Sequence, residues 1–154
     1  MLHYLDGYLS RERWQAVGGL ETLFSYGLDP ARLASLYASS DEVDRRVKEV
    51  IPASHIDFLR SLPVLLCSNK FVFVHAGIRP GIDLVAQDEQ DLLNIRDEFF
   101  NAAHLLDRFV VHGHTPVDMP TLDGRRLGID TGAFHSGRLT ALRIAGKFGK
   151  LLFS

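Results

Sequence analysis

The chain has little of several features that mark particular classes of protein. Its 154 residues include a single cysteine, Cys67, so no disulfide can form within the chain and a disulfide scaffold is excluded. No apolar run approaches the roughly 18 residues that a membrane-spanning helix needs, and no basic stretch leads into an apolar run after Met1. We therefore expect a cytoplasmic protein with no membrane association and no signal peptide.

A strong charge of either sign is also absent. The 17 Lys and Arg residues are nearly balanced by 19 Asp and Glu residues, which gives a formal net charge of −2. Such a chain creates no long-range field that would concentrate polyanions, so general nucleic-acid binding is not expected. The hydrophobic share of 46% and the charged share of 23% are ordinary for a globular protein, and the length predicts one domain, residues 1–154.

Helical patterns dominate the first part of the chain, to about Leu62. Ser10 is placed to cap a helix over 11–26, whose apolar residues recur three and four apart, and the pair Gly18-Gly19 predicts a bend in it. Further helix-start signals follow at Asp29-Pro30, Ser40 and Pro52. We expect residues 1–62 to be mainly helical.

From Pro63 onward, short apolar runs rich in β-branched and aromatic residues alternate with glycine and proline, which is typical of buried strands and turns. The expected strands are 64–67, 71–75, 108–112, 126–130, 139–144 and a last one near 150–153, with a partly helical connector at 87–100. Asp123-Gly124 and Gly146-Lys147 are turn signals, and the second indicates a closing hairpin. The predicted fold class is α+β or α/β, with residues 63–154 mainly β.

Two histidines occupy corresponding places, each at the end of an apolar run where the chain enters a glycine-containing turn: His75 and His114. Strand ends are where open α/β sheets bind ligands, and neutral imidazole is a common ligand of zinc, manganese and iron. The pair therefore predicts a metal site, while hydrogen-bonded structural histidines are the alternative. If the segment around Gly113 is extended, His112 and His114 point the same way, so that one binds a metal and its neighbour orients it. The remaining histidines, His3, His55, His104 and His135, lack such a context.

Two arginines are candidates for phosphate binding. Arg96 lies in the otherwise apolar and acidic segment 92–100, and Arg79 lies in a turn just before Pro80-Gly81. The planar guanidinium group matches phosphate oxygens bidentately. The alternatives are a salt bridge from Arg96 to a nearby acid and an ordinary surface turn at Arg79.

Four segments, in this order, closely resemble motifs of the calcineurin-like metallophosphoesterases: 73–81 (FVHAGIRPG), 93–99 (LNIRDEF), 111–117 (VHGHTPV) and 128–133 (GIDTGA). The branch they resemble most is that of the bacterial serine/threonine phosphoprotein phosphatases, and the resemblance extends over nearly the whole chain. It implies a β-sandwich flanked by helices. It also implies divalent metal ions as cofactors, with manganese expected and iron or zinc as alternatives.

The resemblance also implies roles for individual residues. His75 and His114 would bind one metal, Arg96 would clamp the phosphate oxygens, and His112 would act beside the site. Arg79 stays the candidate for a second substrate contact that its place in the turn suggests. The implied activity is metal-dependent hydrolysis of a phosphoric monoester, with a phosphoprotein or phosphopeptide as substrate. Two metals would generate a nucleophile at neutral pH and neutralise the phosphate charge, as slow phosphoryl transfer requires.

The sequence departs from the family in one major respect. The earlier motifs Gly-Asp-x-His-Gly, Gly-Asp-x-x-Asp-Arg-Gly and Gly-Asn-His-Glu, which supply the remaining ligands, do not occur in it. We therefore expect the second half of the β-sandwich, weak metal binding and little or no catalysis by this chain alone. A separate polypeptide carrying the amino-terminal half, a truncated sequence and a decayed remnant are the three explanations.

Two other functions stay open. One is hydrolysis of bis-nucleoside tetraphosphates by an enzyme of the same superfamily, and the other is a catalytically inactive binding or regulatory module. Competition between a phosphopeptide and a dinucleotide would distinguish a phosphoprotein phosphatase from a bis-nucleoside tetraphosphate hydrolase.

Overall fold

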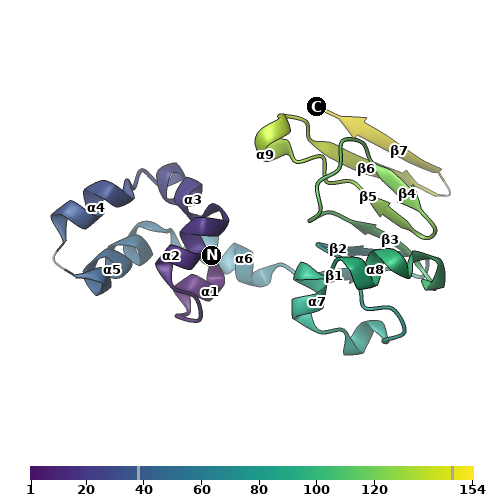
Figure 1. The fold of residues 1–154 in the computed structure, drawn as a ribbon, viewed down its shortest axis with the longest axis horizontal. Helices are drawn as coiled ribbons and strands as arrows, with labels where there is room; N and C mark the ends of the chain where they lie inside the picture. Colours follow the sequence, from purple (N-terminus) through teal and green to yellow (C-terminus); the bar gives the residue numbers. More distant parts are fainter. Residues whose placement is uncertain (38, 147) are drawn as a thin grey trace. The chain divides into compact units, whose positions relative to one another are not determined.

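The chain contains two compact units, Met1–Leu62 and Pro63–Ser154, in a computed structural model that describes residues 1–37, 39–146 and 148–154 (Figure 1). The boundary falls where helical sequence patterns give way to strand-like runs. Each unit has a hydrophobic core of its own. Within the described residues, no helix combines the length and the apolar character needed to cross a membrane. The cytoplasmic location stays a prediction.

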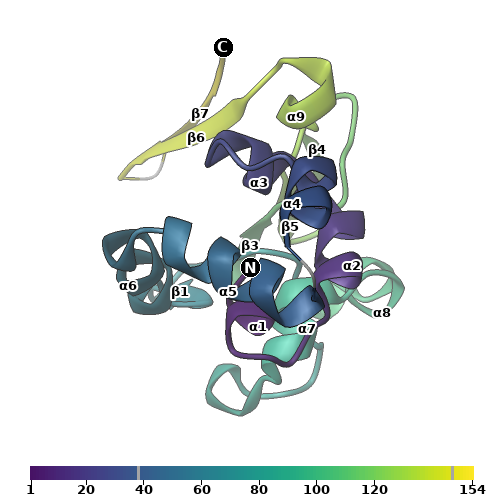
Figure 2. The same cartoon turned by 90° about the vertical axis from the view of Figure 1, so that its left-hand side faces the viewer.

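The first unit is built from helices. In chain order they are α1 (Leu2–Leu5), α2 (Arg11–Trp14), a π-helical turn (Gln15–Gly19), α3 (Leu20–Ser25), α4 (Pro30–Leu36), α5 (Ser40–Val50) and α6 (Ala53–Ser61). Helix α1 contacts α6 (Figure 1), and α4 contacts α5 (Figure 2). The core includes Tyr4, whose ring stacks on Trp14 with centroids 4.5 Å apart, and the fully buried Leu23 and Val47.

Capping side chains start these helices largely where the sequence predicts. The Ser10 hydroxyl accepts the backbone N–H of Arg13 at 3.3 Å, and Asp29 caps α4 with Pro30 as its first residue. The predicted start at Ser40 is confirmed, while the start predicted at Pro52 is displaced by one residue, to Ala53. Helix α5 is capped by Ser39 through a reciprocal capping box, and Pro52 is itself the cap of α6.

The single helix predicted over 11–26 is interrupted. Val17 and Gly18 have non-helical backbone angles, with φ +98° at Gly18, a conformation that glycine adopts without strain. The chain therefore turns between α2 and α3 instead of continuing as one rod. The bend predicted at Gly18-Gly19 lies at this break.

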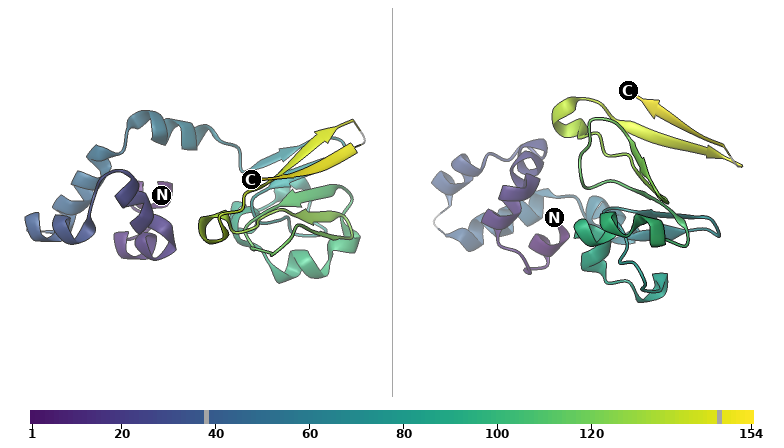
Figure 3. Two further views of the ribbon diagram at one scale, coloured as in Figure 1. Left: turned by 90° about the horizontal axis from the view of Figure 1, so that it is seen from above. Right: turned by 45° about the vertical axis from the view of Figure 1, so that its right-hand side comes forward.

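The second unit contains a mixed five-stranded sheet and a separate two-stranded sheet (Figures 1 and 3). Its strands are β1 (Leu65–Cys67), β2 (Phe71–Val74), β3 (Phe109–His112), β4 (Thr121–Asp123), β5 (Arg126–Gly128), β6 (Thr140–Ala145) and β7 (Phe148–Phe153). The larger sheet has the order β1-β2-β3-β5-β4, in which β2, β3 and β5 are parallel and the edge strands β1 and β4 are antiparallel to their neighbours.

Strands β6 and β7 pair antiparallel from Thr140 opposite Phe153 to Ala145 opposite Phe148, which confirms the closing hairpin. Gly146 has φ +62°, as a tight turn requires, while Lys147 of the predicted turn lies outside the described residues. The mixed sheet with helices agrees with the predicted α+β class. The assignment as half of a β-sandwich stays a prediction.

Short helices pack on one face of β2 and β3. They are η2 (Leu84–Ala86), α7 (Glu89–Asn94), α8 (Asp97–Asn101) and η3 (Ala103–Leu105), and a further helix, α9 (Ala133–Ser136), follows β5. The core beneath them joins Val72 and Val110 of the strands to Leu92, Ile95 and Phe99 of the helical connector. Because side chains alternate along a strand, Val72 is fully buried while Phe73 is 37% exposed on the other side.

Gly77, just after β2, packs directly against this core. A Cβ atom at this position would lie 2.5 Å from Cδ1 of Phe99 and 2.9 Å from Cγ2 of Ile95. Phe99 is completely buried and has no space into which it can withdraw. The glycine in the His-Ala-Gly segment is therefore required by close packing.

We expect Gly77→Ala to lower the free energy of unfolding of the second unit by about 1–3 kcal/mol, as overpacked cores do. The measurement is a urea titration that follows the NMR amide signals of β2 and β3. Gly113→Ala is the matched control, because a Cβ there meets no atom closer than 3.5 Å. Equal stability of the two variants would contradict the packing argument.

An ion pair holds the loop that follows Gly77. Arg79 donates from Nε to Oδ2 of Asp91 at 2.5 Å and from Nη2 to Oδ1 at 2.7 Å. The hydrogen bonds from Arg79 and its positive charge lower the pKa of Asp91 against the smaller opposing effect of desolvation. A carboxyl group with a lowered pKa stabilises the fold above its ordinary pKa of about 4, and that contribution is lost as pH falls.

We expect Asp91→Asn to be less stable than the natural chain at pH 7 and to lose less stability between about pH 5 and pH 2. Thermal unfolding across this pH range, followed through the same amide signals, measures both effects. Asp83→Asn serves as the control, because Asp83 caps η2 without a side-chain hydrogen bond. Parallel pH profiles for Asp91→Asn and the natural chain would rule out the stabilising pair.

Candidate functional site

Three parallel strands, β2, β3 and β5, end at the same edge of the sheet, which is where open α/β sheets bind ligands. His75 directly follows β2, His112 ends β3, and Asp130 lies two residues beyond β5. The strand ends are tied together, since Gly113 N–H donates to the carbonyl of His75 at 2.8 Å and Ile129 N–H to that of His112 at 2.9 Å. These residues line an open depression together with His114.

The structure brings the two histidines predicted as metal ligands together. His75 Nε2 lies 3.1 Å from His114 Nδ1, with the ring planes inclined at 61°. Two imidazole nitrogens at 2.0–2.1 Å from one tetrahedral zinc ion stand about 3.3 Å apart, so the pair fits two ligands of a single ion. No cluster of three or more His, Cys, Asp or Glu suited to a metal ion occurs within the described residues. By themselves, the two imidazoles would therefore supply only part of a coordination shell.

A strained turn presents His114 to His75. Among the described residues, His114 is the one residue other than glycine with a positive φ, +67°. Thr115 N–H donates to the carbonyl of Gly113 at 2.8 Å, which closes a three-residue γ-turn with His114 at its centre. This backbone conformation is uncommon outside glycine and is found preferentially at functional sites. Since the segment is not extended, the side chains of His112 and His114 diverge.

The side chain of His112 points into the protein. It is 3% exposed, and its ring packs against those of Phe99 and Phe100, with centroids 5.0 and 5.8 Å away. Its Nε2 lies 3.5 Å from Nη1 of Arg126, and its Nδ1 lies 3.2 Å from the carbonyl oxygen of Gly113. Burial, aided by the charge of Arg126, lowers the pKa of His112 against the opposing hydrogen bond to Gly113. A catalytic role for His112 stays a prediction.

Arg96 lies at the same turn. It immediately precedes α8, its side chain is exposed, and its Nη1 donates to Oγ1 of Thr115 at 2.8 Å. Within the described part of the chain, it forms no ion pair with a carboxylate, in contrast to the salt bridge considered from sequence alone. The pKa of His114 is lowered, mainly by burial and then by the charges of Arg96 and His75. The lowered pKa favours the neutral form of His114, which is the form in which an imidazole can bind a metal.

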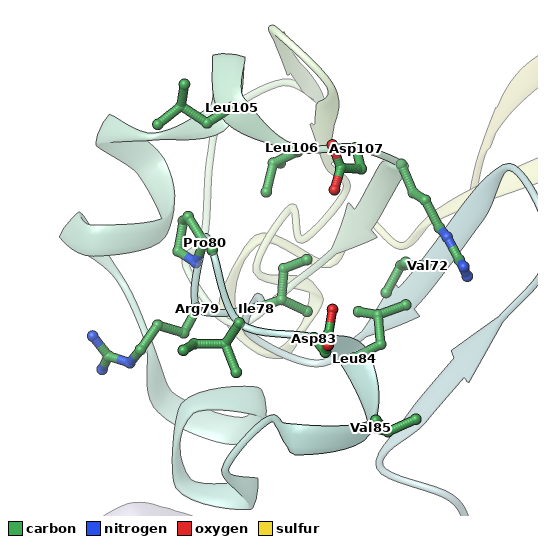
Figure 4. A pocket seen from close by; sticks show the side chains of 13 residues that line it. Val72, Ile78, Arg79, Pro80, Asp83, Leu84, Val85, Leu105, Leu106 and Asp107 are labelled. Carbon is green, nitrogen blue, oxygen red and sulfur yellow. The ribbon is translucent and has the colours of Figure 1, made fainter.

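Arg79 lies at a different place. It lines a separate cavity of about 380 Å³ together with Ile78, Leu84 and Leu106, and Figure 4 shows its guanidinium group turned away from that cavity. The group is held by Asp91 through two hydrogen bonds. The structure therefore assigns Arg79 to the anchoring of its loop, and a contact with substrate stays a prediction.

Asp130 and Thr115 belong to the site but carried no role in the sequence analysis. Oδ1 of Asp130 accepts the backbone N–H of Gly132 at 2.9 Å, and the negative charge of Asp130 acts against the lowering of the pKa of His114. Both residues lie inside the motif segments 111–117 and 128–133. The sequence could have indicated both residues as site candidates, because each lies within one of those segments and just past the end of a strand.

Comparison with known proteins gives a consistent but partial picture. No family model matches the chain. The bis(5'-nucleosyl)-tetraphosphatase PrpE [asymmetrical] of Geobacillus thermodenitrificans is 27% identical over 93% of this chain and 63% of its own length. The protein of the same name from Halalkalibacterium halodurans is 27% identical over 92% of this chain and 62% of its own length. The chain therefore spans less than two thirds of these curated relatives.

Among solved structures, a crystal structure provisionally described as that of a diadenosine tetraphosphatase shares the fold. Its TM-score is 0.57 at 20% identity, over 88% of this chain and 72% of that protein. The relatives are consistent with a hydrolase of the metallophosphoesterase superfamily. Their names agree with the tetraphosphatase alternative and do not support the serine/threonine phosphatase branch or a carboxy-terminal half.

Proposed function

We propose that this chain is part of a metal-dependent hydrolase of bis(5'-nucleosyl) tetraphosphates. The observation that carries the proposal is the approach of His75 Nε2 and His114 Nδ1 to 3.1 Å at the carboxyl ends of neighbouring parallel strands. The similarity to tetraphosphatases over 93% of the chain favours this substrate class over a phosphoprotein. The relatives are named as asymmetrical enzymes, so the expected products are a nucleoside triphosphate and a nucleoside monophosphate.

His75 and His114 are the residues that would hold a divalent metal, with manganese expected and iron or zinc as alternatives. When bound, such an ion lowers the pKa of a coordinated water molecule and neutralises phosphate charge. The protein holds His114 in position through the Gly113–Thr115 turn. Burial and the neighbouring positive charges also lower the pKa of His114, which favours the neutral imidazole.

Arg96 is the residue that would bind the phosphate chain. One guanidinium nitrogen is held by Thr115, which fixes the group at the His114 turn while its other N–H donors stay available for phosphate oxygens. An arginine that no carboxylate neutralises within the described residues keeps its full charge for an anionic ligand.

The remaining metal ligands are proposed to come from a polypeptide segment outside these 154 residues. The two imidazoles found here do not complete a coordination shell, and the curated relatives are longer than the part that this chain matches. Metal binding by the chain alone is therefore expected to be weak, and hydrolysis slow or absent.

The first test of this proposal is calorimetric titration of the chain with Mn²⁺, with Zn²⁺ and Fe²⁺ in parallel. We expect weak binding of about one equivalent, and at least tenfold weaker binding in His75→Ala and in His114→Ala. His104→Ala is the control, because His104 is an exposed histidine of the same unit. Tight binding of two equivalents, or binding that survives both substitutions, would contradict the incomplete two-histidine site.

His114→Gly separates the turn from its side chain. Glycine adopts a positive φ without strain, so we expect this variant to be more stable than the natural chain by about 1 kcal/mol while losing the metal. Urea unfolding together with the same titration measures both quantities. A variant less stable than the natural chain would show that the imidazole stabilises the turn by more than the strain opposes it.

Substrate class is tested by binding, since turnover is expected to be slow. Diadenosine tetraphosphate should shift the NMR signals of Thr115 and its neighbours, and a phosphoserine peptide should compete poorly. We expect Arg96→Ala to weaken the nucleotide by about tenfold, with Arg96→Lys retaining part of the affinity. Arg125→Ala, at an exposed arginine bound to the carbonyl of Asp107, is the control. Preferential binding of the phosphopeptide would contradict the proposal and favour the hypothesis of a serine/threonine protein phosphatase.

A further inference from the structure

Arg126 lies beneath the site and takes no part in the metal or phosphate contacts proposed above. It begins β5, opposite Val110 of β3, and its guanidinium group lies over the ring of Phe100 with Cζ 4.6 Å from the centroid. Its Nη2 donates to Oδ2 of Asp123 at 2.8 Å, and its side chain is 13% exposed. The group is therefore clamped between an aromatic ring and a carboxylate, with Nη1 directed at His112.

The hydrogen bonds of His112 are consistent with one protonation state of its ring. Arginine has donors and no acceptor, so Nε2 of His112 must accept the hydrogen bond from Nη1 of Arg126. A carbonyl oxygen only accepts, so Nδ1 of His112 must donate to the Gly113 oxygen, 3.2 Å away. The neutral ring with its proton on Nδ1 satisfies both contacts at once, and neither the other tautomer nor the imidazolium does.

The Gly113 carbonyl is where this hydrogen-bond chain meets the site. The same oxygen accepts the N–H of Thr115 and closes the γ-turn that holds His114 against His75. The ring of His112 fits there because Gly128, its partner in the strand register, has no side chain. A Cβ at Gly128 would lie 3.3 Å from Cε1 of His112.

We propose that Arg126 is a positioning residue: it fixes His112 in the Nδ1–H tautomer, so that His112 holds the Gly113 carbonyl and with it the turn that presents His114. The link to metal binding rests on the proposed function. The tautomer of His112 and the closure of the turn do not depend on the proposed function, because both exist without a metal or a substrate.

The test is the ¹H–¹⁵N NMR spectrum of the histidine rings at pH 8, recorded on the metal-free chain. In the natural chain, His112 should show a protonated Nδ1 and an unprotonated Nε2. Arg126→Met removes the donor and should move His112 towards the Nε2–H form, with amide exchange at Thr115 roughly two- to tenfold faster. Arg126→Lys restores a donor and should return the Nδ1–H signature. Arg125→Met, at the preceding residue, should change neither signal.

An Nε2–H ring in the natural chain, or a ring unchanged in a folded Arg126→Met variant, would overturn the inference. If Arg126→Met does not give a native spectrum, the inference is tested on Arg126→Lys and the natural chain. Both must show His112 with its proton on Nδ1, and the absence of that form in either would overturn the inference. Failure of the metal titration would leave this result intact, and failure here would leave the His75–His114 pair as a metal site. The two proposals therefore fail separately.

Discussion

The site depends on one backbone oxygen, the carbonyl of Gly113. It accepts the N–H of Thr115 and lies within hydrogen-bond distance of Nδ1 of His112, while the N–H of Gly113 binds the carbonyl of His75. The resulting γ-turn forces a positive φ on His114, which is unfavourable for a residue with a side chain. The turn persists because both sides of it are fastened to the sheet and to its neighbours. The proximity of the two imidazoles is therefore a property of the folded sheet and not of the local sequence.

The rest of the unit serves to keep the strand ends in place. Val72 and Val110 are fully buried under the helical connector, and Phe99 fills the space that Gly77 leaves open. Gly128 makes a similar space on the neighbouring strand, where the ring of His112 lies. In both cases a glycine allows an aromatic or imidazole ring to approach the backbone closely. Core packing and site geometry are thus determined by the same contacts.

Much of the fold could be predicted from local sequence patterns, since most strands and helix caps follow from apolar periodicity and start signals. Strand β4 could not, because Thr121–Asp123 is exposed along its length and contains a single apolar residue, Leu122. The positions of His75 and His114 at strand ends were predictable. Their convergence was not, because it depends on a positive φ at His114, and a positive φ is normally recognised in a sequence by a glycine at that position. The contact between Arg126 and His112 spans 14 residues and follows from strand register, which the sequence alone does not specify.

The two histidines that flank Gly113 contribute to different properties of the protein. His112 contributes to the stability of the fold, and His114 is the residue proposed to bind a ligand. His112 is enclosed by Phe99, Phe100 and Arg126, so replacing it would disturb the core as well as the turn. His114 is only partly buried, and its backbone is strained, so removing its side chain should relieve strain and eliminate the imidazole proposed as a metal ligand. A residue kept in an unfavourable conformation, where glycine would be more stable, is best explained by what its side chain binds. That argument favours a ligand at the His75–His114 pair independently of any relative.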